Sequence, residues 1–224
     1  MIRGQRLWDA EQEPNDVEKP GSHHGKNRRT GRRECRSPAN HPGADMKPGW
    51  QARRLSDVCE IIMGTSPPGE TYNTTGQGVP LINGPVEFSP GSFGKTVRTK
   101  FTTAPNKLCK ENDLILCVRG STTGKMNIAG FDACIGRGVA AIRAKEYQPW
   151  INHFISSKTE DIYRLGTGAT FPNISTPALA ALTLFMPPLS EQRRIVGILD
   201  EAFEGLATAK ANAEQNLQTR PCSV

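Results

Sequence analysis

The sequence predicts an α+β fold: a domain with a curved mixed β-sheet and short helices, followed by one long coiled-coil-type C-terminal helix. Three observations predict this class. Short apolar segments are separated by scattered glycine and proline, a pattern typical of short strands joined by turns. Residues 150–157 carry apolar side chains at helical spacing. The last part of the chain keeps a heptad pattern of apolar residues from residue 195 to residue 217.

The charge of the chain is concentrated in its central part. The 224 residues carry a formal net charge of +6, and the length is sufficient for one large or two small domains. Residues 46–186 contain fifteen basic and ten acidic residues, whereas residues 187–224 contain four basic and five acidic ones. A basic domain suits a polyanionic partner, because neutralised phosphates release their counterions. The same charge also fits an ordinary solvated face, so charge alone does not identify the partner.

Several classes of protein do not fit the composition. No apolar run approaches the ~18 residues of a membrane-spanning helix, and the first six residues have no apolar segment behind them, as a signal peptide would require. We therefore expect a cytoplasmic protein with no membrane partner. None of the six cysteines forms a C-x-x-C pair, and His153 is the only histidine in the globular part, so no metal site is expected. We expect Cys117 and Cys134 to be buried free thiols.

Residues 1–45 do not have the composition of a folded domain. Large apolar residues are scarce there, and such a segment cannot bury enough surface to offset its ordering entropy. Three interpretations stay open. The segment is a disordered tail, or a DNA-gripping arm built on the basic run at residues 26–33, or an extension that is not native. In the third case translation starts at Met46, since periodicity begins only after it.

The following residues predict short elements in order. Residues 54–63 are predicted as a short helix or strand that ends at Gly64 and leads into a proline-containing loop at 64–69. Strands are predicted at residues 79–82, 113–118, 138–143 and 182–186, with a turn at 120–124 and two prolines ending the last strand. A helix is predicted at 150–157, after Pro149, with Ile151, Phe154 and Ile155 facing inward.

The C-terminal helix is predicted to begin with Ser190 as its N-cap and Glu191 in its first turn, where a carboxylate complements the helix dipole. The apolar stripe has steps of three and four residues, close to the 3.5-residue period of a coiled coil. Its members are Ile195, Leu199, Ala202, Leu206, Ala209, Ala213 and Leu217. At 1.5 Å per residue the helix is about 40 Å long. We expect a partner helix rather than packing on its own domain, since so long a helix would extend beyond a small domain.

Three catalytic patterns are nearly matched, but each lacks an essential residue. Residues 120–126 are one residue short of the phosphate-binding pattern G-x-x-x-x-G-K-S/T, and Met126 replaces the hydroxyl that would bind magnesium. Residues 185–189 lack the acceptor and the aromatic residue of an amino-methyltransferase motif. Glu111 and Asp113 have no lysine at nuclease spacing, and a turn before a buried strand explains them more simply. We therefore expect no catalysis from this chain by itself.

Eight short segments follow one another in a characteristic order. They are LSDV at 55–58, GTSP at 64–67, VPLING at 79–84, NDLIL at 112–116, RGSTTG at 119–124, CIGRG at 134–138, GTGATFPNI at 166–174 and PPLSEQ at 187–192. Each segment is a weak signal, but the ordered set ending in a heptad helix is specific. Over residues 55–217 the chain resembles one half of the specificity subunit of a type I restriction-modification system.

The resemblance implies a domain organisation and a set of partners. Residues 46–186 would be a DNA target recognition domain, 187–218 a spacer or dimerisation helix and 219–224 a tail. A full subunit of that family has two recognition domains, separated by two long antiparallel helices, and each domain reads one half of a split target. The implied partners are double-stranded DNA and the methyltransferase and restriction subunits. S-adenosylmethionine, magnesium and ATP would be bound by those partner subunits, and no cofactor by this chain.

The chain departs from the family pattern because it has one recognition domain and one helix. Either it forms a homodimer through that helix and recreates two half-sites as a palindrome, or it is an inactive truncated fragment. Two further functions remain open. The chain could be a detached recognition domain of a fused restriction-methyltransferase enzyme, or an interaction module that uses its helix and does not bind DNA.

The resemblance also implies that loops at one edge of the sheet contact DNA. The expected contact residues are Thr65, Ser66 and Tyr72 in a first loop, Arg119, Ser121 and Lys125 in a second, Arg137, and Thr167, Thr170 and Asn173 in a third. Arginine and lysine can pair with guanine and asparagine with adenine, whereas contacts to phosphates position the protein. A simple strand connection explains residues 166–173 equally well.

Overall fold

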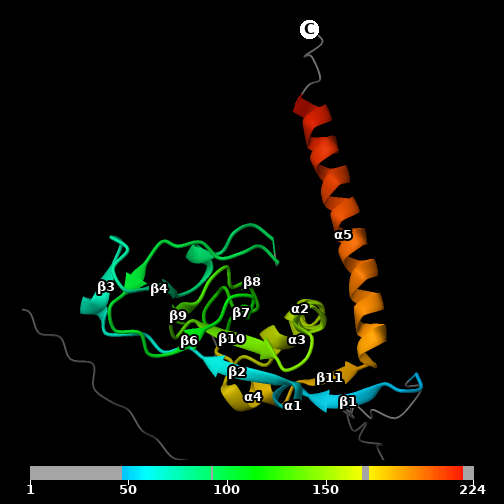
Figure 1. The fold of residues 1–224 in the computed structure, drawn as a ribbon, viewed down its shortest axis with the longest axis horizontal. Helices are drawn as coiled ribbons and strands as arrows, with labels where there is room; N and C mark the ends of the chain where they lie inside the picture. Colours follow the sequence, from blue (N-terminus) through cyan, green and yellow to red (C-terminus); the bar gives the residue numbers. More distant parts are fainter. Residues whose placement is uncertain (1–46, 92, 168–171, 219–224) are drawn as a thin grey trace, which may run out of the picture. The chain divides into compact units, whose positions relative to one another are not determined.

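The computed structural model describes residues 47–91, 93–167 and 172–218, with side chains as far as Asn216. The α+β class is confirmed (Figure 1), but the strands form three sheets rather than one. The elements are β1 (Gln51–Arg54), α1 (Leu55–Val58), β2 (Cys59–Met63), η1 (Gly69–Thr71), β3 (Tyr72–Asn73), β4 (Val79–Ile82), η2 (Pro85–Glu87), β5 (Phe101–Thr102), β6 (Leu108–Cys109), β7 (Leu114–Cys117), β8 (Met126–Ile128), β9 (Ala133–Ile135), β10 (Val139–Ala144), α2 (Gln148–Ser157), α3 (Thr159–Arg164), α4 (Thr176–Ala180), β11 (Thr183–Met186) and α5 (Leu189–Gln218).

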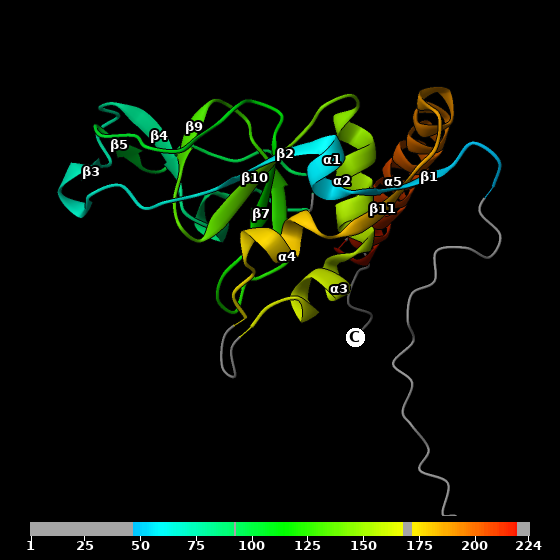
Figure 2. The ribbon, with the colours of Figure 1, turned by 90° about the horizontal axis from the view of Figure 1, so that it is seen from below.

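The sheets have the strand orders β1-β11, β2-β10-β7-β8 and β3-β5-β4-β9-β6. Strands β4 and β9 pair in parallel, and the other strand pairs are antiparallel, so the predicted mixed character is confirmed. The five-stranded sheet and the helices lie toward opposite ends of the four-stranded sheet (Figure 2).

Strand β7 is apolar at every position because both of its faces are buried. Successive side chains of a strand point to opposite faces. Leu114 and Leu116 therefore belong to one hydrophobic core, while Ile115 and Cys117 belong to a second one. The neighbouring strand β10 alternates in the same way between the two cores. Strands β7 and β10 therefore separate the two cores and contribute side chains to both.

Helices cover the first core, and the five-stranded sheet covers the second. The helices contribute one or more buried side chains each, among them Leu55, Ile151, Ile162, Leu179 and Val196. The five-stranded sheet contributes Ile82, Cys109, Ala133 and Ile135 to the second core. The α-helices thus lie on the side of the four-stranded sheet that faces the first core, and the five-stranded sheet lies on the side that faces the second.

The predicted strands are confirmed as β4, β7, β10 and β11, and residues 54–63 form α1 followed directly by β2. The predicted helix is α2, which starts two residues earlier than expected, at Gln148. Pro149 lies in its first turn, where the missing N–H costs no helical hydrogen bond. Ile151 and Ile155 are buried, and Phe154 packs half-buried against the same core, as predicted. The two- and three-residue strands β3, β5, β6, β8 and β9 were not expected.

The long C-terminal helix is confirmed, but the prediction of Ser190 as its N-cap is wrong. Helix α5 begins at Leu189, so Ser190 lies inside the first turn. The carbonyl of Pro188 accepts hydrogen bonds from the backbone nitrogens of Glu191, at 2.9 Å, and Gln192, at 3.0 Å. The helix therefore starts directly after the two prolines. Every residue from Glu201 to Asn216 is exposed, and the side chain of Leu217 lies outside the described residues.

One ion pair with a buried carboxylate joins β10 to the residue that directly precedes β7. The Asp113 side chain is 3% exposed and accepts hydrogen bonds from Arg143 Nε, at 2.9 Å, and Nη2, at 2.7 Å. Asp113 also accepts from the backbone nitrogen of Lys110 at 2.8 Å, which confirms its predicted role in the turn before the strand. Glu60 Oε2 on β2 lies 2.8 Å from Nη1 of the same arginine, but the Glu60 side chain is 58% exposed.

We expect Asp113→Asn to lower the free energy of unfolding by about 2–3 kcal/mol, because it removes the buried partner of a charged, two-point hydrogen bond. Glu60→Gln is the matched control on the exposed side of the same arginine and should cost less than about 1 kcal/mol. Urea denaturation measures both. Equal losses in the two variants would contradict the importance of the buried contact.

Candidate nucleic-acid interface

Four loops meet around an open groove of about 590 Å³. We call it the four-loop groove; its lining residues are Ser66, Pro67, Gly69, Tyr72, Asn83, Arg119, Arg137 and Gly138. The loops follow β2, β4 and β7 and precede β10. Four of the ten predicted contact residues, Ser66, Tyr72, Arg119 and Arg137, therefore lie together at one site.

The pairing of β7 with β10 brings the two arginines together. Cys117 lies opposite Val139 in the antiparallel register, and Arg119 and Arg137 each follow or precede this pair by two residues, so both lie beyond the same end of the strand pair. The backbone nitrogen of Val118 donates to the carbonyl of Gly138 at 3.0 Å, which continues the pairing past the strand ends. Both arginines are exposed. The strand register, and not the loops alone, thus creates a doubly cationic edge.

Glycines allow the loops to approach one another closely. The backbone nitrogens of Gly64 and Thr65 donate to the carbonyls of Val139, at 3.0 Å, and Ile135, at 3.1 Å. A Cβ atom on Gly64 would overlap the carbonyl of Gly136, and one on Gly136 would overlap the Asn83 side chain. At Gly64 an added side chain would overlap backbone, whereas at Gly136 it would require the Asn83 side chain to move. The segment CIGRG therefore packs closely against the loop after β2 and positions Arg137 beside that loop.

Arg119 is fixed by the third predicted loop. Its Nε donates to Asn173 Oδ1 at 3.2 Å, and Asn173 exchanges two backbone hydrogen bonds of 3.1 Å with Thr167. Thr167 and Asn173 therefore close the loop between them, and Thr170 lies outside the described residues. No described protein atom bonds to the terminal nitrogens of Arg119. These nitrogens form a planar pair of donors held in place by the Nε contact.

The other predicted contact residues lie in different surroundings. Thr65 is exposed beside the groove. Tyr72, which lines the groove, donates from its hydroxyl to the carbonyl of Pro67 at 3.1 Å. Ser121 is exposed in the turn after β7 and lines neither this groove nor the adjacent hollow. Lys125 lines that adjacent hollow, of about 580 Å³, together with Phe88 and other residues. Contact of any of these residues with DNA stays a prediction.

The cations at this edge have no neutralising partner among the described side chains. Arg119, Lys125 and Arg137 are exposed, and none of them lies within ion-pair distance of a described carboxylate. Elsewhere Arg143, Lys158 and Arg164 are paired. Unpaired cations around an open groove attract a polyanion.

The family model of the type I restriction modification DNA specificity domain matches residues 47–218. The chain belongs to this family. The resemblance inferred from the ordered segments is thereby confirmed.

Individual relatives agree with the family assignment. A protein of Methanocaldococcus jannaschii described as a type I restriction enzyme MjaX specificity subunit is 33% identical over 174 residues, which is 75% of this chain and 40% of the relative. The HsdS subunit from Thermoanaerobacter tengcongensis is 35% identical with a TM-score of 0.67, over 77% of this chain and 42% of that one. A chain from a structure on the assembly and conformational transition of the type I R-M system is 36% identical with a TM-score of 0.70, over 80% of this chain and 44% of that one.

The chain therefore spans about two fifths of the length of these relatives. A type I restriction-modification S subunit from M. genitalium shares the fold, with a TM-score of 0.54 at 20% identity.

Asn83 also lines the groove, although it was not among the predicted contact residues. The signal was present, since Asn83 belongs to the VPLING segment that carried the resemblance.

The cysteines of the specificity domain are structural. Cys59, Cys109, Cys117 and Cys134 are buried and free, as predicted for the last two. Burial raises the pKa of Cys59 to about 12 and the pKa values of Cys109 and Cys117 to about 11, so these thiols stay protonated at neutral pH.

Within the described residues no group of three His, Cys, Asp or Glu side chains could hold a metal ion. No described helix is both long and apolar enough to cross a membrane.

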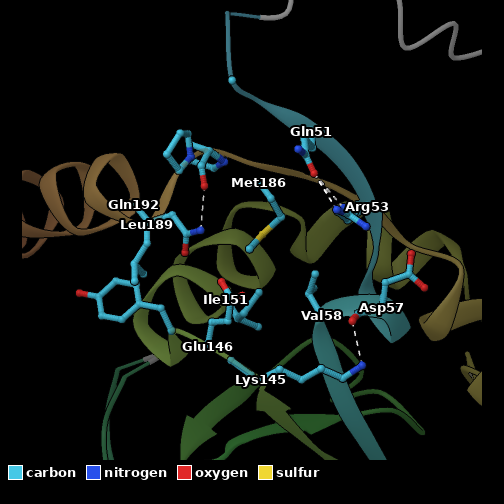
Figure 3. Close-up of a pocket in the computed structure, with 15 residues that line it drawn as sticks. Gln51, Arg53, Asp57, Val58, Lys145, Glu146, Ile151, Met186, Leu189 and Gln192 are labelled. Carbon is cyan, nitrogen blue, oxygen red and sulfur yellow. Dashed lines mark hydrogen bonds between the residues drawn. The ribbon is translucent and has the colours of Figure 1, made fainter.

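A separate pocket of about 420 Å³ lies where α5 joins the domain (Figure 3). Gln192 anchors the helix there by donating from Nε2 to the carbonyl of Pro187 at 2.9 Å. On the opposite side Lys145 Nζ donates to the carbonyl of Asp57 at 2.8 Å. None of the lining residues also lines the four-loop groove. The pocket thus belongs to the joint between domain and helix.

The close approach of the loops can be tested at Gly64. We expect Gly64→Ala to lower the melting temperature by roughly 2–10 °C, because the added Cβ overlaps a backbone carbonyl that cannot move alone. Gly69→Ala, in the same loop, meets open space and should change stability by no more than about 0.5 kcal/mol. Thermal unfolding followed by circular dichroism measures the melting temperature of both variants. Equal melting temperatures for Gly64→Ala and Gly69→Ala would show that the loop after β2 can move away from Gly136 without loss of stability.

Proposed function

We propose that this chain is a half-sized specificity subunit that reads one part of a split DNA target for a type I restriction-modification complex. The observation that carries the proposal is the four-loop groove, which Arg119, Arg137 and Asn83 line together and where neither arginine has a neutralising partner among the described side chains. Family membership and the similarity to specificity subunits support it.

The groove has the chemistry that base reading requires. A guanidinium can pair with guanine through two hydrogen bonds, and a side-chain amide can do the same with adenine. Arg119 is held by Asn173 through Nε, so its terminal donors are oriented before DNA binds. Contacts to phosphates would come from the exposed cations around the groove, including Lys125. Preorganised donors reduce the entropy lost on binding.

In this proposal the chain binds and directs, and other polypeptides catalyse. Its partners are double-stranded DNA and the methyltransferase and restriction subunits, in the cytoplasm. S-adenosylmethionine, magnesium and ATP are bound by those subunits. The buried, protonated thiols and the dispersed carboxylates of the described domain support a non-catalytic role.

Two copies would be needed to read both halves of a target. The long helix α5, exposed from Glu201 to Asn216, supports a homodimer joined by α5. Such a dimer predicts a palindromic site, because its two-fold axis relates the two half-sites. A detached recognition domain of a fused enzyme would read an asymmetric site instead, and an inactive fragment would select no sequence.

The first test is selection of bound DNA from a random duplex pool by the full chain together with its neighbouring methyltransferase subunit. We expect an enriched palindromic motif. An enriched asymmetric motif would favour the fused-enzyme alternative. Absence of enrichment, with a folded methyltransferase present, would refute sequence recognition.

The roles of the two arginines can be separated on the selected site. We expect Arg119→Ala and Arg137→Ala each to weaken binding by about 1–3 kcal/mol. A base-reading arginine should lose discrimination at one position, whereas a phosphate-contacting one should lower affinity uniformly and reduce the salt dependence by about one counterion. The control is Arg53→Ala, an equal charge change on exposed β1 outside the groove. Fluorescence anisotropy at several salt concentrations measures all three, and an unchanged affinity would remove that arginine from the site.

A further inference from the structure

A buried carboxylate holds the loop that carries Asn83. Glu87 is 1% exposed, and the ion pairs formed among the described side chains do not include it. Its Oε2 accepts hydrogen bonds from the backbone nitrogens of Asn83, at 3.2 Å, and Gly84, at 3.1 Å. Its Oε1 accepts from the Thr99 hydroxyl at 3.2 Å. Two backbone N–H groups just after β4 thus depend on one side chain.

Glu87 is itself fixed by its backbone. It ends the turn η2, where its nitrogen donates to the carbonyl of Gly84 at 3.3 Å, and its own carbonyl accepts from the backbone nitrogen of Val97 at 2.8 Å. A buried charge without a cation costs free energy unless hydrogen bonds satisfy it, and an apolar residue would fill this space without that cost. The carboxylate adds the capacity to accept from three donors at once.

Asn83 is also confined by the loop that precedes β10. A Cβ on Gly136 would overlap the Asn83 side chain, and one on Gly138 would lie 2.6 Å from the Asn83 carbonyl oxygen. Ile82, the preceding residue, is the last residue of β4 and is paired with β9. Although Asn83 lines the four-loop groove, no described protein group forms a hydrogen bond with its side-chain amide. The amide is therefore held in place, with its donor and its acceptor left for a ligand.

We infer that Asn83 reads an adenine of the DNA target and that Glu87 is the positioning residue for this contact. The inference rests on the proposed function and names one of the bases that the groove reads. An amide presents an acceptor and a donor side by side, which matches N6 and N7 of adenine in the major groove. Both hydrogen bonds require the amide in one position and one plane. Glu87 fixes the backbone from which that side chain extends.

The two oxygens of Glu87 hold different parts of the chain. Oε2 holds Asn83 and Gly84, whereas Oε1 holds Thr99. Loss of the Thr99 contact removes a part-buried hydrogen bond but leaves the Asn83 loop in place, and loss of Oε2 releases that loop. A carboxylate that only stabilises the fold would give the same DNA-binding result in both cases. A positioning residue would change base reading in the second case alone.

The test uses the full chain with its methyltransferase subunit, on the DNA site that the complex selects. Discrimination at a position is the dissociation constant for a site with another base pair there, divided by that for the selected site. We expect Asn83→Ala to lower discrimination at one A·T position by about tenfold and to leave the other positions within about twofold. Fluorescence anisotropy measures these ratios. An equal effect at all positions, no effect, or an effect at a G·C position would overturn the assignment of Asn83.

Glu87→Met fills the buried space but replaces both oxygens by a weak acceptor. It should lower discrimination by at least about fivefold at the position that Asn83→Ala affects, and by less than about twofold elsewhere. The double variant should discriminate as well as Asn83→Ala alone, because Glu87 acts through Asn83. A loss spread over all positions, or a further loss in the double variant, would contradict the positioning role.

Two variants are the controls for the contact. Thr99→Val should lower the melting temperature but keep discrimination within about twofold, since Oε2 still holds the Asn83 loop. Glu87→Gln should keep discrimination within about threefold, because its carbonyl oxygen can accept from both backbone nitrogens while its amide donates to Thr99. A loss of discrimination in either control as large as that of Glu87→Met would overturn the Oε2 contact as the cause.

Asn83→Gln tests the position of the amide without changing the buried carboxylate, so it decides the matter even if Glu87→Met does not fold. The amide is kept but moved outward by one methylene, and discrimination should fall by about tenfold, as in Asn83→Ala. Undiminished discrimination would show that the amide needs no fixed position and would overturn the role of Glu87. A complex that selects no DNA sequence would instead refute the proposed function, whereas selection without an Asn83-dependent position would overturn this inference alone.

Discussion

The antiparallel pairing of β7 with β10 is the constraint on which the domain depends. Both strands are buried on both faces, so their alternating side chains serve two cores at once. The same pairing that fills the cores brings Arg119 and Arg137, each two residues beyond its end, to one groove. A one-residue slip would exchange the cores' side chains and separate the arginines. Core packing and the geometry of the cationic edge are therefore specified by one set of backbone hydrogen bonds.

Close backbone approach is the second requirement of the site. Gly64 and Gly136 lie where any side chain would overlap a neighbouring loop, and the loops are joined by backbone bonds that depend on this approach. The conformational freedom of glycine in the unfolded chain opposes folding at these positions. The adjoining strands, buried in both cores, offset that cost. A rigid sheet thus carries loops that would not be well positioned alone.

The sequence predicted those elements whose signal is local. The run at residues 113–118 is apolar after its first residue and was predicted as a strand, and the heptad stripe predicted a long helix that extends past its domain. Strands of two or three residues, such as β5 and β9, exist through pairing with distant segments and leave no periodicity. Ser190 was assigned as N-cap on propensity, but the prolines before it fix the start at Leu189. At the site, loop membership predicted Arg119 and Arg137, whereas the convergence of Asn83 with them depends on the parallel pairing of β4 and β9.

Contacts near its start join helix α5 to the domain. Gln192 and Val196 are buried, and His153 Nε2 on α2 lies 2.9 Å from Asp200 Oδ1 while its ring stacks on Phe203. Every residue from Glu201 to Asn216 is exposed. The direction of the exposed part is therefore set by contacts nearer the N-terminal end of the helix.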